Sequence, residues 1–468
     1  MMYISTRGNA PELSFDDVVL TGLARDGGLY VPKTWPSLSL EEISSLKGLS
    51  YPQLAARVMA PFVAGSISED ELAKLAAKAY ANFDHPDIAP LVRLNDDEYV
   101  LELFHGPTLA FKDYALQFLG HLFDHILKKR GEKITIAGAT SGDTGSAAIE
   151  ACRDRDAIEI FILHPQGKVS EVQRRQMTTV LSDNVHNIAL QGTFDDCQNT
   201  VKALFDDEKF RDSVHLSAVN SINWARILAQ VVYYFWAALQ VGAPDKKVSF
   251  AVPTGNFGNV FAGFAASKMG LPIEQLIIGS NANDVLIRFI ESGKMELHDV
   301  VHTISPSMDI GISSNFERLL FELSGRDGKK VSAIMAGFAK TKSYAVDDEF
   351  MQNLKQLFSG ARFDDVATKK IIGDVYAENK MLLDPHSAIG LGAARASRNN
   401  SGAPVIVLAT AHPAKFPDAV MQAANQHPEL PPHLADLLSR PERSEVLQNS
   451  VSVVKKYIEQ TLQKRGKS

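Results

Sequence analysis

Cysteine is scarce in this chain. Among 468 residues only Cys152 and Cys197 occur. A single disulfide would contribute little in so long a chain, and no cysteine spacing typical of a metal site is present. We therefore expect a reducing compartment and no metal centre.

Long apolar runs and an excess of positive charge are also missing. The longest apolar run, residues 231–239, is far shorter than the roughly 20 residues that span a bilayer. The opening residues MMYISTRG lead into no apolar segment of signal-peptide length. The 48 Lys and Arg face 55 Asp and Glu, for a net charge of −7, whereas nucleic-acid and membrane surfaces need a basic face. These absences predict a cytoplasmic protein that binds neither nucleic acid nor membranes.

Apolar residues are nevertheless plentiful, at 45% against 22% charged residues, which is typical of a globular protein. From about residue 133, short apolar runs alternate regularly with segments of helical spacing. Strands are expected at 133–137, 157–163, 185–190, 214–219, 248–252, 275–279 and 404–410, and helices at 145–153, 169–181, 194–206, 224–239 and 257–269. Such alternation predicts an α/β fold with βαβ units and a mainly parallel sheet.

Three further segments complete the predicted organisation. Residues 1–95 form an N-terminal domain with a short strand at 29–32 and helices at 51–62 and 68–83. Ser68 and Glu71 have the spacing of a capping box at the start of the second helix. Residues 296–380 break the alternation and are interpreted as an insertion or subdomain. The α/β core then comprises residues 96–295 and 381–468, and its last helix is expected near 444–463.

Two glycine-rich loops lie between a predicted strand and a predicted helix. The first is GATSGDTGS, residues 138–146, and the second is PTGNFGN, residues 253–259. Backbone N–H groups in such loops, together with a helix N-terminus, can bind an anion. Either loop alone is equally compatible with an ordinary tight turn. Two of them in one parallel sheet favour a ligand site, because the carboxyl ends of strands are where ligands bind.

A lysine lies in an apolar and aromatic setting in the segment HGPTLAFKD, residues 105–113. A lysine in a desolvated pocket loses basicity and can act as an amine nucleophile. A lysine that extends its charge to the surface from a helix start is the alternative for Lys112. One reactive lysine and two anion loops together suggest a phosphorylated carbonyl cofactor.

These motifs, in this order, resemble the threonine synthase family of fold-type-II pyridoxal-phosphate (PLP) enzymes. The resemblance rests on HGPTLAFKD, GATSGDTGSAA, PTGNFGN and the later LATAHP, and on YISTRG and DGGLYVP near the N-terminus. It extends over nearly the whole chain. It implies a tryptophan synthase β-like fold, in which two open, mainly parallel twisted sheets are flanked by helices, with a small N-terminal domain.

The resemblance also implies roles for particular residues. Lys112 would form the Schiff base with PLP, and Thr410 would contact the pyridine nitrogen. The cofactor phosphate would bind the loop of Gly255, Asn256, Phe257, Gly258 and Asn259. Asp143 would lie near the 3′ oxygen of the cofactor, where many relatives have Asn. The substrate carboxylate would bind Thr140, Ser141, Gly142 and Thr144, and the substrate phosphate would bind Asn220, Ser221, Asn223 and Arg226.

The implied reaction converts O-phospho-L-homoserine and water to L-threonine and phosphate, by a monomer or homodimer. Another PLP lyase of this fold, either a serine/threonine dehydratase or a phospho-amino-acid lyase, is the nearest alternative. A non-catalytic PLP-binding protein is a more distant one. Arg226 separates the lyases, because a dehydratase has no leaving phosphate to bind. The roles of His105, His412 and Lys415 stay open at this point.

Overall fold

The computed structural model describes residues 1–466, which cluster into two compact units. Unit 1 comprises Met1–Ala115 and Ser221–Glu429. Unit 2 comprises Leu116–Asn220 and the chain from Leu430 onward. Within residues 1–466, no helix has the length and hydrophobicity that a membrane span requires.

The N-terminal part of unit 1 is a small sheet followed by helices. Its strands pair antiparallel in the order β2-β1-β3, and they are β1 (Met2–Ser5), β2 (Leu13–Ser14) and β3 (Tyr30–Pro32). The helices are α1 (Phe15–Thr21), α2 (Leu40–Ser45), α3 (Tyr51–Val63) and α4 (Glu69–Tyr80). Ser68 and Glu71 form the predicted capping box at the start of α4.

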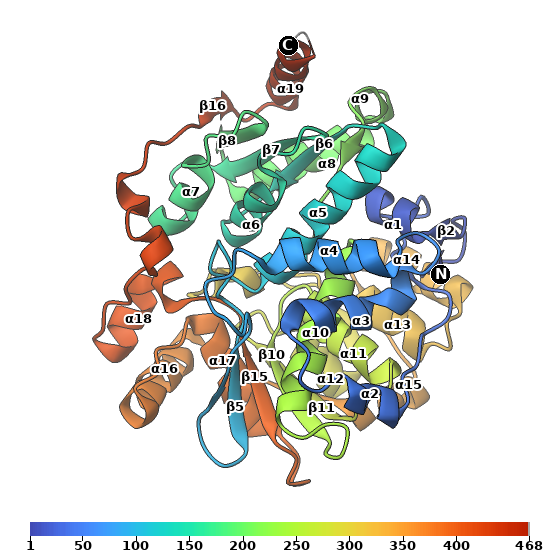
Figure 1. The fold of residues 1–468 in the computed structure, drawn as a ribbon, viewed down its shortest axis with the longest axis vertical. Coiled ribbons are helices and arrows are strands. Elements are labelled where there is room, and N and C mark those ends of the chain that lie inside the picture. The colour runs from blue at the N-terminus through green and yellow to red at the C-terminus, as the bar shows by residue number, and fades with distance from the viewer. Residues whose placement is uncertain (467–468) are drawn as a thin grey trace. The chain divides into compact units, whose positions relative to one another are not determined.

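A six-stranded sheet forms the centre of unit 1, in the order β14-β11-β10-β15-β5-β4 (Figure 1). Its strands are β4 (Leu91–Arg93), β5 (Glu98–Glu102), β10 (Val248–Pro253), β11 (Ile273–Ser280), β14 (Phe358–Arg362) and β15 (Val405–Ala409). All pairs are parallel except β4 with β5. Because β14 belongs to the predicted insertion at 296–380, that segment contributes an edge strand to the sheet, and its boundaries stay a prediction.

Helices and short elements complete unit 1. They are α10 (Trp224–Gln240), α11 (Gly258–Lys268), α12 (Val285–Ser292), the antiparallel strand pair of β12 (Lys294–Glu296) and β13 (Ser343–Ala345), η1 (Pro306–Met308), α13 (Phe316–Leu323), α14 (Gly328–Thr341), α15 (Asp348–Leu357), α16 (Asp365–Asn379), α17 (Pro385–Ser397), η2 (Pro413–Lys415) and α18 (Pro417–Ala424).

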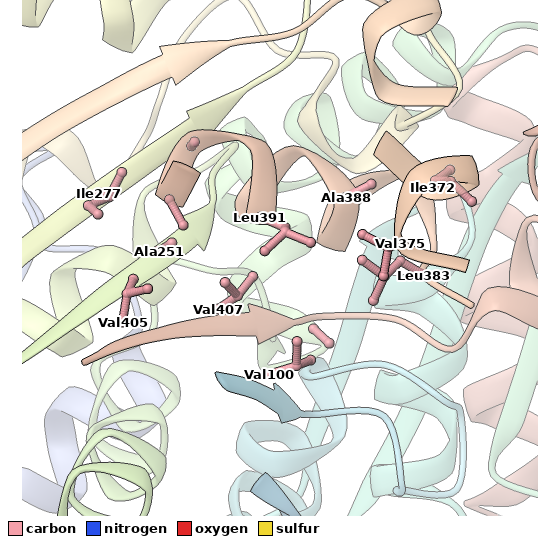
Figure 2. Packing of buried hydrophobic residues seen from close by; sticks show 13 residues of the cluster. Val100, Ala251, Ile277, Ile372, Val375, Leu383, Ala388, Leu391, Val405 and Val407 are labelled. Atoms are coloured by element: carbon pink, nitrogen blue, oxygen red, sulfur yellow. The ribbon is translucent and has the colours of Figure 1, made fainter. Parts of the chain in front are cut away.

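The apolar core of the six-stranded sheet fixes where β10 and β15 end. Leu391 and Ala388 of α17 belong to one apolar cluster with Ala251, Val405 and Val407 of these strands, and Leu391 lies above Val407 (Figure 2). Each buried CH₂ contributes about 0.8 kcal/mol to folding. The N-terminus of α17 and the carboxyl ends of two central strands are thereby held in one rigid frame.

Unit 2 contains a five-stranded, wholly parallel sheet in the order β16-β8-β7-β6-β9. Its strands are β6 (Ile134–Ala139), β7 (Ile158–Pro165), β8 (Val185–Gln191), β9 (Leu216–Ser217) and β16 (Glu445–Gln448). Its other elements are α6 (Asp143–Cys152), α7 (Glu171–Thr178), α8 (Phe194–Asp206), α9 (Glu208–Ser213), η3 (Pro432–Leu434), η4 (Leu437–Ser439) and α19 (Val451–Arg465). The helix α5 (Lys112–Arg130) begins in unit 1 and continues in unit 2.

The structure confirms the α/β architecture with two mainly parallel sheets and corrects two elements. The predicted helix at 444–463 is wrong in its first part, because Glu445–Gln448 is a strand paired with β8 and the helix starts only at Val451. The predicted strand at 214–219 shrinks to Leu216–Ser217. Both errors lie at sheet edges, where pairing with a distant strand overrides local pattern.

Candidate active site

Lys112 is the first residue of α5 and is almost fully buried, with its Nζ 4.9 Å from the centre of the Phe111 ring. The residues around it are locked in place. The N–H and Oγ1 of Thr108 donate to the two carboxylate oxygens of Asp113 at 2.8 and 2.6 Å. Buried Lys415 donates its Nζ to the Thr108 carbonyl at 2.7 Å. This contact assigns Lys415 a structural role in holding the loop that precedes Lys112.

The loop before Lys112 pairs directly with the end of β15. Phe111 N–H donates to the Thr410 carbonyl at 2.9 Å, and His412 N–H donates to the Leu109 carbonyl at 3.0 Å. Leu109 adopts a left-handed backbone with φ of 62°, a conformation that costs a non-glycine residue about 1–2 kcal/mol. The structure thus places Lys112 one residue from the backbone that pairs with Thr410.

Residues more than 50 positions away hold the loop after β10, residues 254–257, in a concave shape that we call the cup. Ser313 Oγ donates to the Gly255 carbonyl at 2.7 Å, and the Asn315 N–H and Nδ2 both donate to the Asn256 carbonyl. A side chain at Gly255 would place its Cβ 2.7 Å from the Ser307 carbonyl oxygen, so only glycine fits. With these carbonyls turned away, the loop leads into α11, whose first N–H groups have no acceptor within the helix.

Asn259, in the first turn of α11, has the donor chemistry that a phosphate needs. The hydroxyls of Tyr233 and Tyr234 donate to its Oδ1 at 2.6 and 3.0 Å, which fixes the orientation of the amide. Its buried Nδ2 has no hydrogen-bond partner among residues 1–466. An orphaned buried donor is costly unless a ligand satisfies it. The glycine cup and this donor therefore fit the phosphate of PLP.

The start of α10 holds the residues predicted to bind the substrate phosphate. Asn223 caps the helix, because its Oδ1 accepts from Ala225 N–H at 3.0 Å and its Nδ2 donates to the Val19 carbonyl at 2.8 Å. Arg226 is buried, and desolvation lowers its pKa to about 10, so it stays cationic at neutral pH. Burying a cation is costly, and an anionic ligand offsets that cost.

Ser221 and Asn220, which are also predicted to bind the substrate phosphate, lie on either side of the sequence boundary between units 1 and 2. Ser221 begins the second segment of unit 1, and its carbonyl lies 3.8 Å from where a Cβ on Gly258 would be. Asn220 ends the first segment of unit 2.

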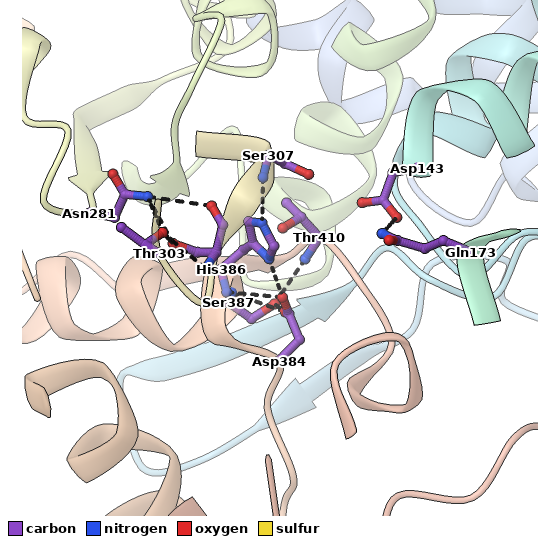
Figure 3. Close-up of polar contacts among 10 residues, drawn as sticks. Asp143, Gln173, Asn281, Thr303, Ser307, Asp384, His386, Ser387 and Thr410 are labelled. Carbon is purple, nitrogen blue, oxygen red and sulfur yellow. Dashed lines mark hydrogen bonds and ion pairs between the residues drawn. The ribbon is translucent and has the colours of Figure 1, made fainter. Parts of the chain in front are cut away.

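The loop between β6 and α6, in unit 2, is stabilised from within. Thr140 Oγ1 accepts from the N–H groups of Gly142 and Gly145, both at 2.9 Å. Gly142 has φ of 147°, a backbone that favours glycine. Gln173 Nε2 donates to Asp143 Oδ1 at 2.8 Å, so the two side chains point toward each other (Figure 3). In this loop Ser141 is exposed and Thr144 is half-buried. That the loop contacts the same ligand as Lys112 stays a prediction.

Two histidines near the lysine loop have structural contacts. His105 bonds Glu102 at 2.7 Å and Asp84 at 3.2 Å through its two ring nitrogens. His412 accepts from Ala414 N–H at 3.2 Å, and burial lowers its pKa to about 4, so it is neutral at physiological pH.

Sequence reasoning missed several residues that shape this site. Tyr234 lies in the helix expected at 224–239, and Ser313 and Asn315 lie in the segment interpreted as an insertion, but no site role is predicted for any of them. Asp384 was missed as well, although Asp-Pro before a helical segment is a recognisable N-terminal signal. Nothing in the local pattern shows which distant backbone such side chains reach.

Comparisons with known proteins define the class. The family described as pyridoxal-phosphate dependent enzyme matches residues 85–349. The chain is therefore a PLP-dependent enzyme. The families described as threonine synthase N terminus and threonine synthase, C-terminal, match residues 2–80 and 387–458.

The chain belongs to the threonine synthase family. It is 56% identical to the threonine synthase of Pseudomonas aeruginosa, with 98% of each chain covered. The solved structure of PLP-bound threonine synthase from Brucella melitensis matches with a TM-score of 0.97 and 52% identity over 98% of this chain and 99% of that one. Yeast threonine synthase matches with a TM-score of 0.93 and 40% identity over 99% of each chain. The fold-type-II prediction and the PLP cofactor are thereby confirmed.

Proposed function

We propose that the enzyme converts O-phospho-L-homoserine and water to L-threonine and inorganic phosphate, the last step of threonine biosynthesis. One arrangement within unit 1 carries the proposal. Phe111, the residue before buried Lys112, pairs with the backbone of Thr410, a glycine cup lies at the end of β10, and a buried arginine lies in the first turn of α10. The hydroxyl of Tyr233 on α10 links that helix to Asn259 beside the cup.

The residues of unit 1 hold the cofactor and move the proton. PLP, when bound, withdraws electrons from the substrate α-carbon, so that α- and β-protons can be removed. Lys112 would hold the cofactor covalently and, once its amine is free, would take the α-proton of the substrate as general base. The N–H groups of the cup, with Asn259 Nδ2, would bind the cofactor phosphate. The hydroxyl of Thr410 would serve as a neutral partner of the pyridine nitrogen.

The substrate is recognised at its two anionic ends. Arg226, with Asn220, Ser221 and Asn223, binds the γ-phosphate and stabilises the charge that develops as it leaves. The loop from Thr140 to Thr144 binds the α-carboxylate with its backbone N–H groups. Asp143, oriented by Gln173, would be the partner of the 3′ oxygen of the cofactor.

The test is a product balance on the PLP-loaded enzyme. With O-phospho-L-homoserine, we expect phosphate and L-threonine to appear in equal amounts. A dehydratase would instead release ammonia and a 2-oxo acid from free threonine, and that result would overturn the proposal. Lys112→Ala should abolish turnover, whereas Lys128→Ala, an exposed lysine on the same helix that pairs with Asp124, should not.

We also infer that the enzyme acts in the cytoplasm, as a monomer or homodimer. Both cysteines are free and buried, and the absence of a disulfide between them suits a reducing compartment. Light scattering gives the mass of the assembly, and a mass above that of a dimer would contradict this inference.

A further inference from the structure

A fully buried carboxylate, Asp384, lies at the N-terminus of α17 with both of its oxygens in use. Oδ2 accepts from the His386 N–H at 2.9 Å and from His386 Nδ1 at 2.6 Å. Oδ1 accepts from the Ser387 N–H at 3.0 Å and from the Ser387 hydroxyl. A helix cap needs only one such bond. Asp364 of α16, for example, is exposed and caps its helix by accepting from Ala367 N–H at 2.8 Å.

The first arm of this network reaches Thr410. The Ser387 hydroxyl donates a hydrogen bond to Asp384, and its oxygen accepts one from the Thr410 N–H at 3.0 Å (Figure 3). The Thr410 carbonyl accepts from Phe111 N–H at 2.9 Å. Both backbone groups of Thr410 are therefore fixed, and the direction of its side chain follows from them.

The second arm reaches the phosphate cup. Because His386 Nδ1 donates to Asp384, the ring presents Nε2 as an acceptor, and Ser307 N–H donates to it at 3.2 Å (Figure 3). The carbonyl of the same Ser307 lies 2.7 Å from where a Cβ on Gly255 would be. Asp384 thereby selects the tautomer of His386 that holds the wall of the cup.

The segment that carries Ser307 is stiffened independently. Thr303 N–H and Oγ1 donate to Asp309 at 2.9 and 2.7 Å, and Asn281 Nδ2 donates to Thr303 Oγ1 and Asp309 Oδ1, both at 2.8 Å. The hydrogen bond from Ser307 to His386 therefore joins two rigid parts, and a shift of one moves the other.

We propose that Asp384 is a positioning residue of the cofactor site, which holds Thr410 through Ser387 and the wall of the phosphate cup through His386. The proposal rests on the proposed contacts of Thr410 and of the Gly255 loop with PLP. Its function is to set the spacing between the two ends of the cofactor. The two arms make different predictions, because one ends at the ring nitrogen and the other at the phosphate.

The Thr410 arm is tested by Ser387→Ala, measured on the visible absorption band of the PLP-loaded protein. We expect the band maximum and its pH midpoint to move, kcat to fall about tenfold because the Thr410 N–H loses its acceptor, and PLP affinity to stay within about twofold. Ser387→Thr, which keeps the hydroxyl, should restore the wild-type band. Asp364→Asn, which weakens a helix cap with no link to the cofactor, should leave band and affinity unchanged.

The cup arm is tested by His386→Gln, titrated with PLP after removal of the cofactor. We expect PLP to bind at least about fivefold more weakly, with the band maximum unmoved, because a displaced cup wall disturbs the phosphate. If Asp384 acts through two arms, Ser387→Ala changes the position of the band and His386→Gln changes the affinity for PLP. A merely structural role would change stability alike in both variants and would move neither readout.

Thr410→Val separates this proposal from the proposed function. It should move the band, and Ser387→Ala should add no further shift in that background, because residues acting through one contact are not additive. If Thr410→Val leaves the band unmoved, the assignment of Thr410 falls, and the first arm falls with it. If it moves the band while Ser387→Ala and His386→Gln leave band and affinity as in wild type, the role of Asp384 is overturned and the proposed function stands.

Discussion

Two loops of similar composition, one in each unit, are held in place in different ways. The loop of residues 254–257 in unit 1 is braced by Ser307, Ser313 and Asn315, which lie about 50 positions later in the chain. The loop of residues 140–142 in unit 2 is held by its own Thr140 and by one neighbouring side chain, Gln173 of α7, which packs against Gly142. The second loop therefore depends on its own residues and one adjacent helix, whereas the first depends on three residues of a distant segment. We therefore expect substitutions in the two loops to fail differently.

The largest effect is expected for Gly255→Ala. Its Cβ would meet a backbone carbonyl at 2.7 Å, which cannot yield without displacing η1. PLP affinity should fall by about 100-fold or more, as for a clash of a few kcal/mol, when measured by titration of the apoenzyme. Gly337→Ala is the matched control, because no atom lies within 4 Å of the added Cβ. Unchanged PLP binding in Gly255→Ala would show that the brace is dispensable.

Removal of the buried cation on α10 should come next. Arg226→Gln should raise the KM for the phosphorylated substrate by about 30-fold or more, because a charged hydrogen-bond partner is lost from a buried site. PLP affinity should be unchanged. Arg226→Lys keeps the charge and should retain part of the substrate affinity, though not the two-pronged geometry. Equal loss of PLP and substrate binding would mean that Arg226 supports the fold and not the substrate.

A smaller effect is expected in unit 2. Thr140→Ala leaves the N–H groups of Gly142 and Gly145 without their acceptor, at a cost of about 1–2 kcal/mol. Substrate KM should rise about tenfold with the absorption band of the cofactor unmoved. Thr140→Ser should behave like wild type. A change in the band would indicate that this loop contacts the cofactor more closely than we propose.

The smallest effect concerns pH. Burial lowers the pKa of His412 to about 4, below its usual 6.5, so the unfolded chain binds more protons between these values. Stability present above pH 6.5 is therefore lost as the pH falls toward 4, by about 1 kcal/mol between pH 7 and 5 for this half-buried ring. Urea denaturation of His412→Asn should show a flatter pH dependence than wild type. An equally steep dependence would assign the effect to another group, such as His164 of unit 2, whose pKa burial also lowers.

Much of this molecule follows from its sequence, and the exceptions have a common cause. The alternation of strands and helices, the two glycine loops and Lys112 are local patterns, and the structure follows them except at the edge strands β9 and β16. The contact of Ser387 with Thr410, the contact of Ser313 with Gly255 and the pairing of β16 with β8 all join residues far apart in sequence, so no local pattern reports them. The same holds for Tyr234, whose spacing shows a buried face but not the hydroxyl contact with Asn259.

The central claim is that Lys112 carries the cofactor. The direct measurement is reduction of the PLP-loaded protein with borohydride, followed by proteolysis and mass spectrometry of the peptides. The account predicts a single reduced pyridoxyl group, attached to Lys112. Attachment at any other lysine, including Lys415, or no attachment at all, would contradict it.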